Sequence, residues 1–388
     1  MPKGNRFRHQ AYTDAPPEAP HHVLTPGTPP PVGSSEFRRR MEEVGAALRA
    51  AGVTAVYLAD GSCVGPDAPR VLARIARAFP SAGPVFRRLI RRAGLAPKSV
   101  HYSEGYARLF ESALNPPGAP RIPVRLFEWS NENHHLGRAD GAVRLIRRLA
   151  SLDPQRRHRV LLWGHGHAGN VFALATNLLG GDGDAIGRFF DAADVYYRWP
   201  LARCVDIPFW YRVRELLLGR GRLPADVKLD VATFGTPVRY GWESGAYGRL
   251  VHFVHRRVAE GQPLHQAPFP PEVDDVVEAV AGDYIQQLAV AGTNVRPAIA
   301  AWRARLADRR LGCLLERDLG GQDPLDRFRA GTIIPEEGTT LLVDYGLPQD
   351  GLDEHHAGHA VYTRPQWLLF HAEEVAKQLY SAKARQAA

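Results

Sequence analysis

Apolar and polar positions along the chain predict strands that alternate with helices. Continuous apolar runs typical of buried strands occupy residues 53–61, 122–130, 158–164, 228–237, 249–257 and 339–346. Apolar residues recur at helical spacing in residues 37–52, 69–80, 83–94, 137–152 and 170–181. Strands that alternate with helices are typical of a parallel sheet covered on both faces. We therefore expect an α/β fold with a mostly parallel, doubly wound sheet.

Three stretches depart from this alternation and set the expected domain boundaries. Residues 1–35 contain eight prolines and few large apolar side chains, which predicts an extended or disordered arm. Residues 182–226 are rich in aromatic residues, and residues 260–335 combine proline-rich loops with helix. We expect these two stretches to be insertions that form a cap or lid above the sheet. The remainder predicts one domain over residues 36–388.

One turn between a strand and a helix carries candidate chemistry. The strand at residues 158–164 enters Gly164-His165-Gly166-His167-Ala168, and a helix follows at once. Small residues suit such a turn, because the residue at its tip has a strained backbone and crowded neighbours. This is the context of the nucleophile elbow, Gly-x-Ser-x-Gly. Gly166 occupies the position of the serine.

This turn and the order of the later strand ends resemble the α/β-hydrolase superfamily, in its lipase-like and esterase-like branches. The family commonly has Gly-His-Ser-x-Gly at the elbow, and the resemblance covers roughly residues 50–380. It implies hydrolysis of a small-molecule ester or lipid-like substrate. It also implies that the end of an early strand supplies an oxyanion-hole amide. The binding residues expected on this basis are His165, His167, Asp60, Gly61 and Ser62.

The resemblance also suggests the rest of a catalytic triad. The family order is nucleophile, acid and histidine. His359 follows the last predicted strand and maps best to the histidine, ahead of His355 and His356. Asp283, after the strand at residues 249–257, is the first choice for the acid. Asp274, Asp275 and Asp344 remain open as alternatives.

Gly166 changes the chemistry that the resemblance implies. Glycine has no side chain, so the route through a covalent acyl-enzyme is closed at this position. Loss of the nucleophile in a serine hydrolase lowers turnover by a factor on the order of 10⁶. The remaining rate is about 10³–10⁴ times that of the uncatalysed reaction in water. Two outcomes follow. Either His359 activates a water as general base, or the protein is a non-catalytic pseudohydrolase that binds an apolar ligand or a protein partner.

Metal and cofactor motifs are missing from the sequence. The 16 histidines include local clusters, but His-Glu-x-x-His and Cys-x-x-Cys spacings are absent, so no metal site is expected. A hydrolase that uses the histidine cluster with a metal-bound water remains a third alternative. Phosphate-binding and dinucleotide-binding glycine patterns are also absent, and we expect no cofactor.

Charge and cysteine content limit the partners and the compartment. The formal net charge is +8, yet only five of the 49 basic residues are lysine, which is typical of an arginine-rich compositional bias. We therefore expect no nucleic-acid partner. Arginine pairs and triplets at 38–40, 87–92 and 147–148 predict solvated helix faces or a weak contact with an anionic membrane surface. Three scattered cysteines and the absence of an apolar signal segment favour the cytoplasm. The oligomeric state stays open.

Overall fold

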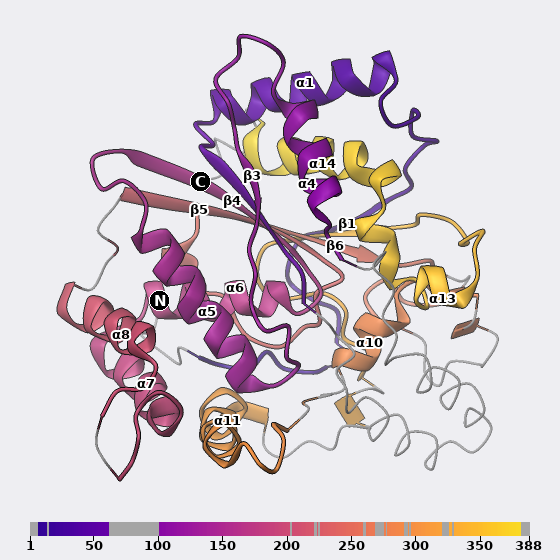
Figure 1. The fold of residues 1–388 in the computed structure, drawn as a ribbon. Coiled ribbons are helices and arrows are strands. Elements are labelled where there is room, and N and C mark those ends of the chain that lie inside the picture. Colours follow the sequence, from indigo (N-terminus) through magenta and orange to yellow (C-terminus); the bar gives the residue numbers. More distant parts are fainter. Residues whose placement is uncertain are drawn as a thin grey trace.

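The structure, a computed structural model, has one parallel sheet at its centre (Figure 1). It describes residues 7–13, 15–61, 101–201, 204–220, 223, 226–258, 261–267, 275–276, 278–290, 294, 296–319, 326–327 and 330–381. Seven strands are paired in the order β1-β7-β6-β5-β4-β2-β3, and every pairing is parallel. The expected α/β fold is confirmed.

The strands match the apolar runs of the sequence, with one addition. They are β1 (His21–Leu24), β2 (Ala55–Ala59), β3 (Val124–Leu126), β4 (Arg157–His165), β5 (Asp226–Phe234), β6 (Arg249–His255) and β7 (Thr339–Val343). Strand β4 pairs with β2 on one side and with β5 on the other, with Gly164 opposite Ala59 and Thr233. The strand that carries the elbow therefore lies in the interior of the sheet.

Helices cover both faces of the sheet. They are α1 (Ser35–Ala50), α4 (Glu104–Leu114), α5 (His135–Ala150), α6 (Ala168–Leu179), α7 (Gly183–Tyr197), α8 (Pro208–Arg220), α10 (Tyr284–Val290), α11 (Trp302–Leu315), α13 (Leu352–His355) and α14 (Leu368–Tyr380). One face packs against α1, α4 and α14, and the opposite face against α5 and α6 (Figure 1). Successive residues of β4 alternate between these two cores, with Leu162 in one and Trp163 in the other. Burial on both faces explains why β4 is continuously apolar.

Part of the proline-rich arm, expected to be extended or disordered over residues 1–35, is extended and ordered. His21–Leu24 forms the edge strand β1, paired in parallel with β7, and the N–H of Thr340 donates to the carbonyl of Pro20 at 2.9 Å. The Phe7 ring stacks on Phe189 with centroids 5.2 Å apart. The partners of the arm, β7 and Phe189, are distant in the sequence, and the composition of the arm gives no indication of them.

The two expected insertions contain helices that enlarge one layer. Helices α7 and α8 lie between α6 and β5, and α11 lies between β6 and β7. Helices α8 and α11 pack on α5, and α7 packs on α8 and α11, so that Phe189, Trp210 and Leu311 are buried in one core. Their role as a cap stays a prediction. The helices expected at residues 69–80 and 83–94 lie outside the described residues.

None of the described helices is both long enough and apolar enough to cross a bilayer.

Candidate functional site

The turn after β4 has the backbone of a sharp elbow. Gly166 follows β4 with φ 56°, in the left-handed region that favours glycine, and α6 begins two residues later. Its N–H donates to the carbonyl of Phe234 at 2.9 Å, and its carbonyl accepts from Thr236 Oγ1 at 2.8 Å. Glycine is also required beside the tip, because a Cβ on Gly164 would lie 2.5 Å from the Phe172 ring. The predicted elbow therefore has the expected strand-to-helix shape.

A buried histidine–carboxylate pair lies at the ends of β6 and β7. His359 Nδ1–H donates to Asp283 Oδ2 at 2.7 Å, and both side chains are almost fully buried. The other carboxylate oxygen, Oδ1, accepts from the backbone N–H of Gln286 at 2.9 Å. This donor set holds the Asp283 carboxylate in a fixed position and orients the imidazole of His359.

The elbow and the histidine–carboxylate pair meet at one edge of the sheet. The ring of His165, the residue before Gly166, lies against the ring of His359 with centroids 4.3 Å apart and an angle of 33°. His165 Nε2–H donates to the His359 carbonyl at 3.3 Å. At the end of β5, a Cβ on Gly235 would lie 2.8 Å from Asp283 Oδ2. The carboxyl ends of parallel strands, where ligands bind in α/β folds, thus bring these groups together.

The structure distinguishes among the alternative acids. Asp344 Oδ1 accepts from Arg257 Nε at 3.1 Å and from the N–H of Gly346 at 2.9 Å, so its partners lie away from the elbow. Asp275 is described, and Asp274 lies outside the described residues. Asp283 is the carboxylate that the structure places against His359.

The amide expected to line an oxyanion hole is already engaged. In the nucleophile elbow, the N–H of the residue after the tip stabilises the oxyanion. Here that N–H belongs to His167, and it donates to the carbonyl of Gly61 at 3.2 Å. The contact needs glycine at this position, because a Cβ on Gly61 would lie 2.3 Å from the Ala168 nitrogen. Ser62, the third residue of the predicted binding segment, lies outside the described residues.

Asp60 connects the end of β2 with the elbow. Its Oδ2 accepts from the backbone N–H of Tyr102 at 2.9 Å, and its Oδ1 lies 3.8 Å from His165 Nδ1. Burial raises the pKa of Asp60 to about 7, against the opposing effect of the Tyr102 hydrogen bond. The carboxyl group therefore changes charge near neutral pH.

Both histidines of the elbow are neutral. Burial lowers the pKa of His165 well below its usual value, and the neighbouring His359 lowers it further. Burial also lowers the pKa of His167, with a further contribution from the buried guanidinium groups of Arg138 and Arg239. His167 Nδ1 accepts from the Asn170 amide at 3.3 Å. A neutral His165 is a favourable neighbour for a charge on His359, because two adjacent imidazolium ions would repel each other.

Sequence reasoning missed several residues that shape the site. Gly235 packs against the histidine–carboxylate pair, Thr236 packs against the elbow, and Arg138 is fully buried. Arg138 Nε donates to the Tyr240 hydroxyl at 2.9 Å, and Arg138 Nη1 donates to Asn133 Oδ1 at 2.9 Å. The glycine at the end of the strand in residues 228–237 was the only sequence signal. The burial of Arg138 had none, because its partners are distant in the chain.

Clustered histidines have structural partners in the described residues. His134 Nδ1 accepts from the N–H of Gly137 at 2.8 Å and caps α5, and His135 Nδ1 contacts the Tyr240 hydroxyl at 2.8 Å. Among the described residues, no group of three or more His, Cys, Asp or Glu side chains could hold a metal ion.

The basic clusters of the sequence are partly paired. Arg39 contacts Glu43 at 2.5 Å, and Arg40 binds Glu373 through two hydrogen bonds of 2.7 Å. The Arg147 guanidinium lies 5.5 Å from the centre of the Phe209 ring. The cluster at residues 87–92 lies outside the described residues.

Comparisons with known proteins were made for the whole chain. No family model, no curated protein and no solved structure matches it. The α/β fold class therefore rests on the parallel sheet and its two helical layers, and the candidate site rests on its own geometry.

Proposed function

We propose that the protein has the α/β-hydrolase fold and hydrolyses carboxylic esters with a water in place of the serine nucleophile. The elbow, the acid and the histidine follow β4, β6 and β7 in the order of the hydrolase triad. The elbow tip is Gly166, so the attacking oxygen must come from outside the chain. An ester or lipid-like small molecule is the substrate class that the resemblance implies.

The observation that supports this proposal is the 2.7 Å hydrogen bond between His359 and Asp283 beside the elbow. A buried carboxylate is costly unless it is paired and hydrogen-bonded, and Asp283 has both His359 and the Gln286 N–H as partners. A proton on Nδ1 that is donated to Asp283 makes Nε2 the nitrogen that accepts a proton. This is the arrangement of a general base with an orienting carboxylate.

The proposed reaction has two proton transfers. Water attacks the ester carbonyl carbon while His359 Nε2 removes one of its protons, and the carbonyl oxygen becomes an oxyanion. The tetrahedral intermediate then breaks its bond to the alkoxy oxygen, which takes the proton back from His359. The products are a carboxylic acid and an alcohol. Asp283 stabilises the imidazolium ion between the two transfers.

The assay compares the unmodified protein with His359→Ala on p-nitrophenyl esters of short and medium acyl length. General-base catalysis contributes about 10²–10⁴ to the rate, so we expect a loss of that size in the variant. His371→Ala is the matched control, because His371 is also fully buried but lies on α14. An ester hydrolysis rate that is the same in His359→Ala as in the unmodified protein would contradict the proposal.

A second candidate function is favoured by the contact between His167 and Gly61. That hydrogen bond occupies the His167 N–H that would stabilise an oxyanion. The elbow therefore lacks two parts of a serine hydrolase, the serine hydroxyl and a free backbone amide. A pseudohydrolase that binds an apolar ligand or a protein partner fits these losses. It predicts no turnover above buffer together with saturable binding of a fluorescent fatty-acid analogue.

We further propose a cytoplasmic location. Cys204 and Cys313 are exposed free thiols, which suits a reducing compartment. A weak contact with anionic membranes remains part of the proposal, and cosedimentation with vesicles with and without phosphatidylserine tests it.

A further inference from the structure

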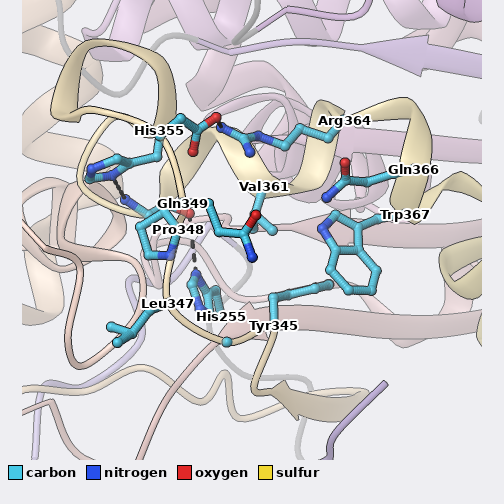
Figure 2. Close-up of a pocket in the computed structure, with 13 residues that line it drawn as sticks. His255, Tyr345, Leu347, Pro348, Gln349, His355, Val361, Arg364, Gln366 and Trp367 are labelled. Atoms are coloured by element: carbon cyan, nitrogen blue, oxygen red, sulfur yellow. Dashed lines mark hydrogen bonds and ion pairs between the residues drawn. The ribbon is translucent and has the colours of Figure 1, made fainter. Parts of the chain in front are cut away.

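A pocket of about 400 Å³ is lined in part by residues that flank His359 in the chain, among them Gly358 and Val361 (Figure 2). It is formed at the end of β6 and by the two segments 345–350 and 355–367, which follow β7. Gly358 lines it, whereas His359 and Asp283 are not among its lining residues. The volume lies within the range of small-molecule sites, about 300–1,000 Å³. The pocket is therefore distinct from the acid–base pair, although the two share one loop.

Aromatic rings form part of the pocket wall. Tyr345 and Trp367 lie with their ring centroids 5.1 Å apart and their planes at 66° (Figure 2). The Tyr345 hydroxyl is hydrogen-bonded to His371 Nε2 at 2.6 Å. Its polar end is therefore already satisfied. What the rings offer a ligand is apolar surface, on which the flat face of another ring packs well.

Two buried acceptor atoms belong to side chains that line the pocket. His255 Nδ1–H donates to the Gly358 carbonyl at 3.3 Å, so its Nε2 is an acceptor. Asp350 Oδ2 accepts from Arg364 Nη2 at 2.5 Å, which leaves Oδ1 as a second acceptor. In the described part of the chain, neither His255 Nε2 nor Asp350 Oδ1 has a hydrogen-bond partner, and both atoms are buried. A ligand that donates two hydrogen bonds would satisfy them.

Formal charges in the pocket cancel. Arg364 pairs with Asp350 and keeps the pKa of that carboxyl below its usual value despite burial, and burial lowers the pKa of His255. Because the two charges are paired, the pocket offers a charged ligand no net opposite charge that would offset the cost of its desolvation. The pocket thus favours a neutral ligand with several donors and one apolar face.

We propose that this pocket binds a neutral sugar ring, either a monosaccharide or the terminal residue of a glycoside. Its hydroxyl groups donate to His255 Nε2 and Asp350 Oδ1, and its apolar face packs on Trp367. The side-chain amides of Gln349 and Gln366, which also line the pocket, supply donors and acceptors for the remaining hydroxyl groups. This site does not depend on the proposed hydrolysis.

The test titrates the full chain with methyl glycosides of glucose, galactose and mannose, followed by saturation-transfer NMR and calorimetry. Glucosamine and glucuronate are the charged controls. We expect at least one neutral glycoside to bind, and both charged sugars to bind about tenfold more weakly or not at all. Asp350→Asn and Trp367→Ala should each weaken binding about tenfold. Trp302→Ala, at a half-exposed tryptophan outside the pocket, should have no effect.

Three results would overturn the proposal. They are no binding by any neutral glycoside up to its solubility limit, equal binding by a charged sugar, and binding that survives both pocket substitutions. Thermal melting of each variant shows whether it folds, and Asp350→Asn keeps the size of the side chain in case Trp367→Ala unfolds. Sugar binding is measured by NMR and calorimetry and ester hydrolysis by turnover, so failure of the ester assay and failure of this test are distinguishable.

Discussion

The two halves of the candidate site differ in what they retain. The half built on β2 and β4 keeps the backbone of an elbow but has Gly166 at its tip and the His167 amide bonded to Gly61. The half that follows β6 and β7 has both side chains of the proposed acid–base pair, with His359 hydrogen-bonded to Asp283. The sheet holds both halves at one edge, yet each half has its own strands. The nucleophile can therefore be absent without disturbing the acid–base pair.

Packing fixes the positions of Asp283 and His359. Removal of the partner of a buried, charged hydrogen-bonding group costs about 1–3 kcal/mol or more, because that group is left unsatisfied. Asp283 and His359 also pack on Gly235, so their positions depend on a third strand. At the elbow, by contrast, a glycine with φ 56° satisfies the backbone without any side chain.

The largest effect is expected from restoring a nucleophile at the elbow. Gly166→Ser should raise ester turnover about 10³–10⁴-fold, because a serine nucleophile is worth on the order of 10⁶ and the engaged His167 amide withholds about 10²–10³. Labelling of residue 166 by a fluorophosphonate, located by mass spectrometry, measures the new nucleophile. Gly166→Ala has the same backbone strain without the hydroxyl and serves as control. If Gly166→Ser hydrolyses esters no faster than Gly166→Ala, a serine at this position does not act as a nucleophile.

The second prediction tests the acid. Asp283→Asn should reduce the ester hydrolysis of the unmodified protein by about 10²–10⁴-fold, because an amide no longer fixes the His359 tautomer or stabilises its charge. Asp344→Asn is the matched control, since Asp344 also follows a strand but pairs with Arg257. Equal losses in the two variants would remove the special role assigned to Asp283.

The third prediction concerns the charge of Asp60 at the elbow. Its folded pKa of about 7 lies above the usual 3.8, so the folded protein retains a proton that the unfolded chain releases. The free energy of unfolding should therefore fall as the pH rises from about 4 to about 7, by up to roughly 4 kcal/mol from this group. Asp60→Asn should flatten this dependence in urea unfolding at about pH 4 and about pH 8. The exposed Asp226→Asn is the control. If the slopes of the Asp60 variant and the unmodified protein coincide, Asp60 does not titrate in this range.

The fourth prediction concerns the strand end that packs against the acid–base pair. Gly235→Ala would bring a Cβ to 2.8 Å from Asp283 Oδ2 and 3.1 Å from His359 Cε1, at a backbone φ of 56°. We expect a loss of about 1–3 kcal/mol from crowding, together with backbone strain of about 1–2 kcal/mol. Gly52→Ala, at φ 81° with nothing within 4 Å of its Cβ, measures the strain alone. Equal losses at the two positions in chemical unfolding would show that the pair tolerates the added methyl group.

Local sequence was sufficient for six of the seven strands and for the elbow. Six apolar runs predicted β2 to β7, because a strand buried on both faces is apolar at successive positions and stands out from the polar segments around it. The glycine-rich turn predicted the sharp entry into α6, since only small residues fit beside Phe172 and at a positive φ. These features depend on neighbours within a few residues, which the sequence displays directly.

The partners of these elements were decided by the tertiary structure alone. The pairing of β1 with β7 joins residues on opposite ends of the chain, and a proline-rich segment gives no sign of it. The sequence left four aspartates open as the acid, and the structure placed Asp283 against His359. The tertiary structure also brings the His167 N–H to the Gly61 carbonyl, and His255 and Asp350 into the lining of one pocket. Such contacts depend on where distant strand ends meet, and no local sequence pattern encodes that. Strand and turn propensities, by contrast, depend on adjacent residues and can be recognised in the sequence.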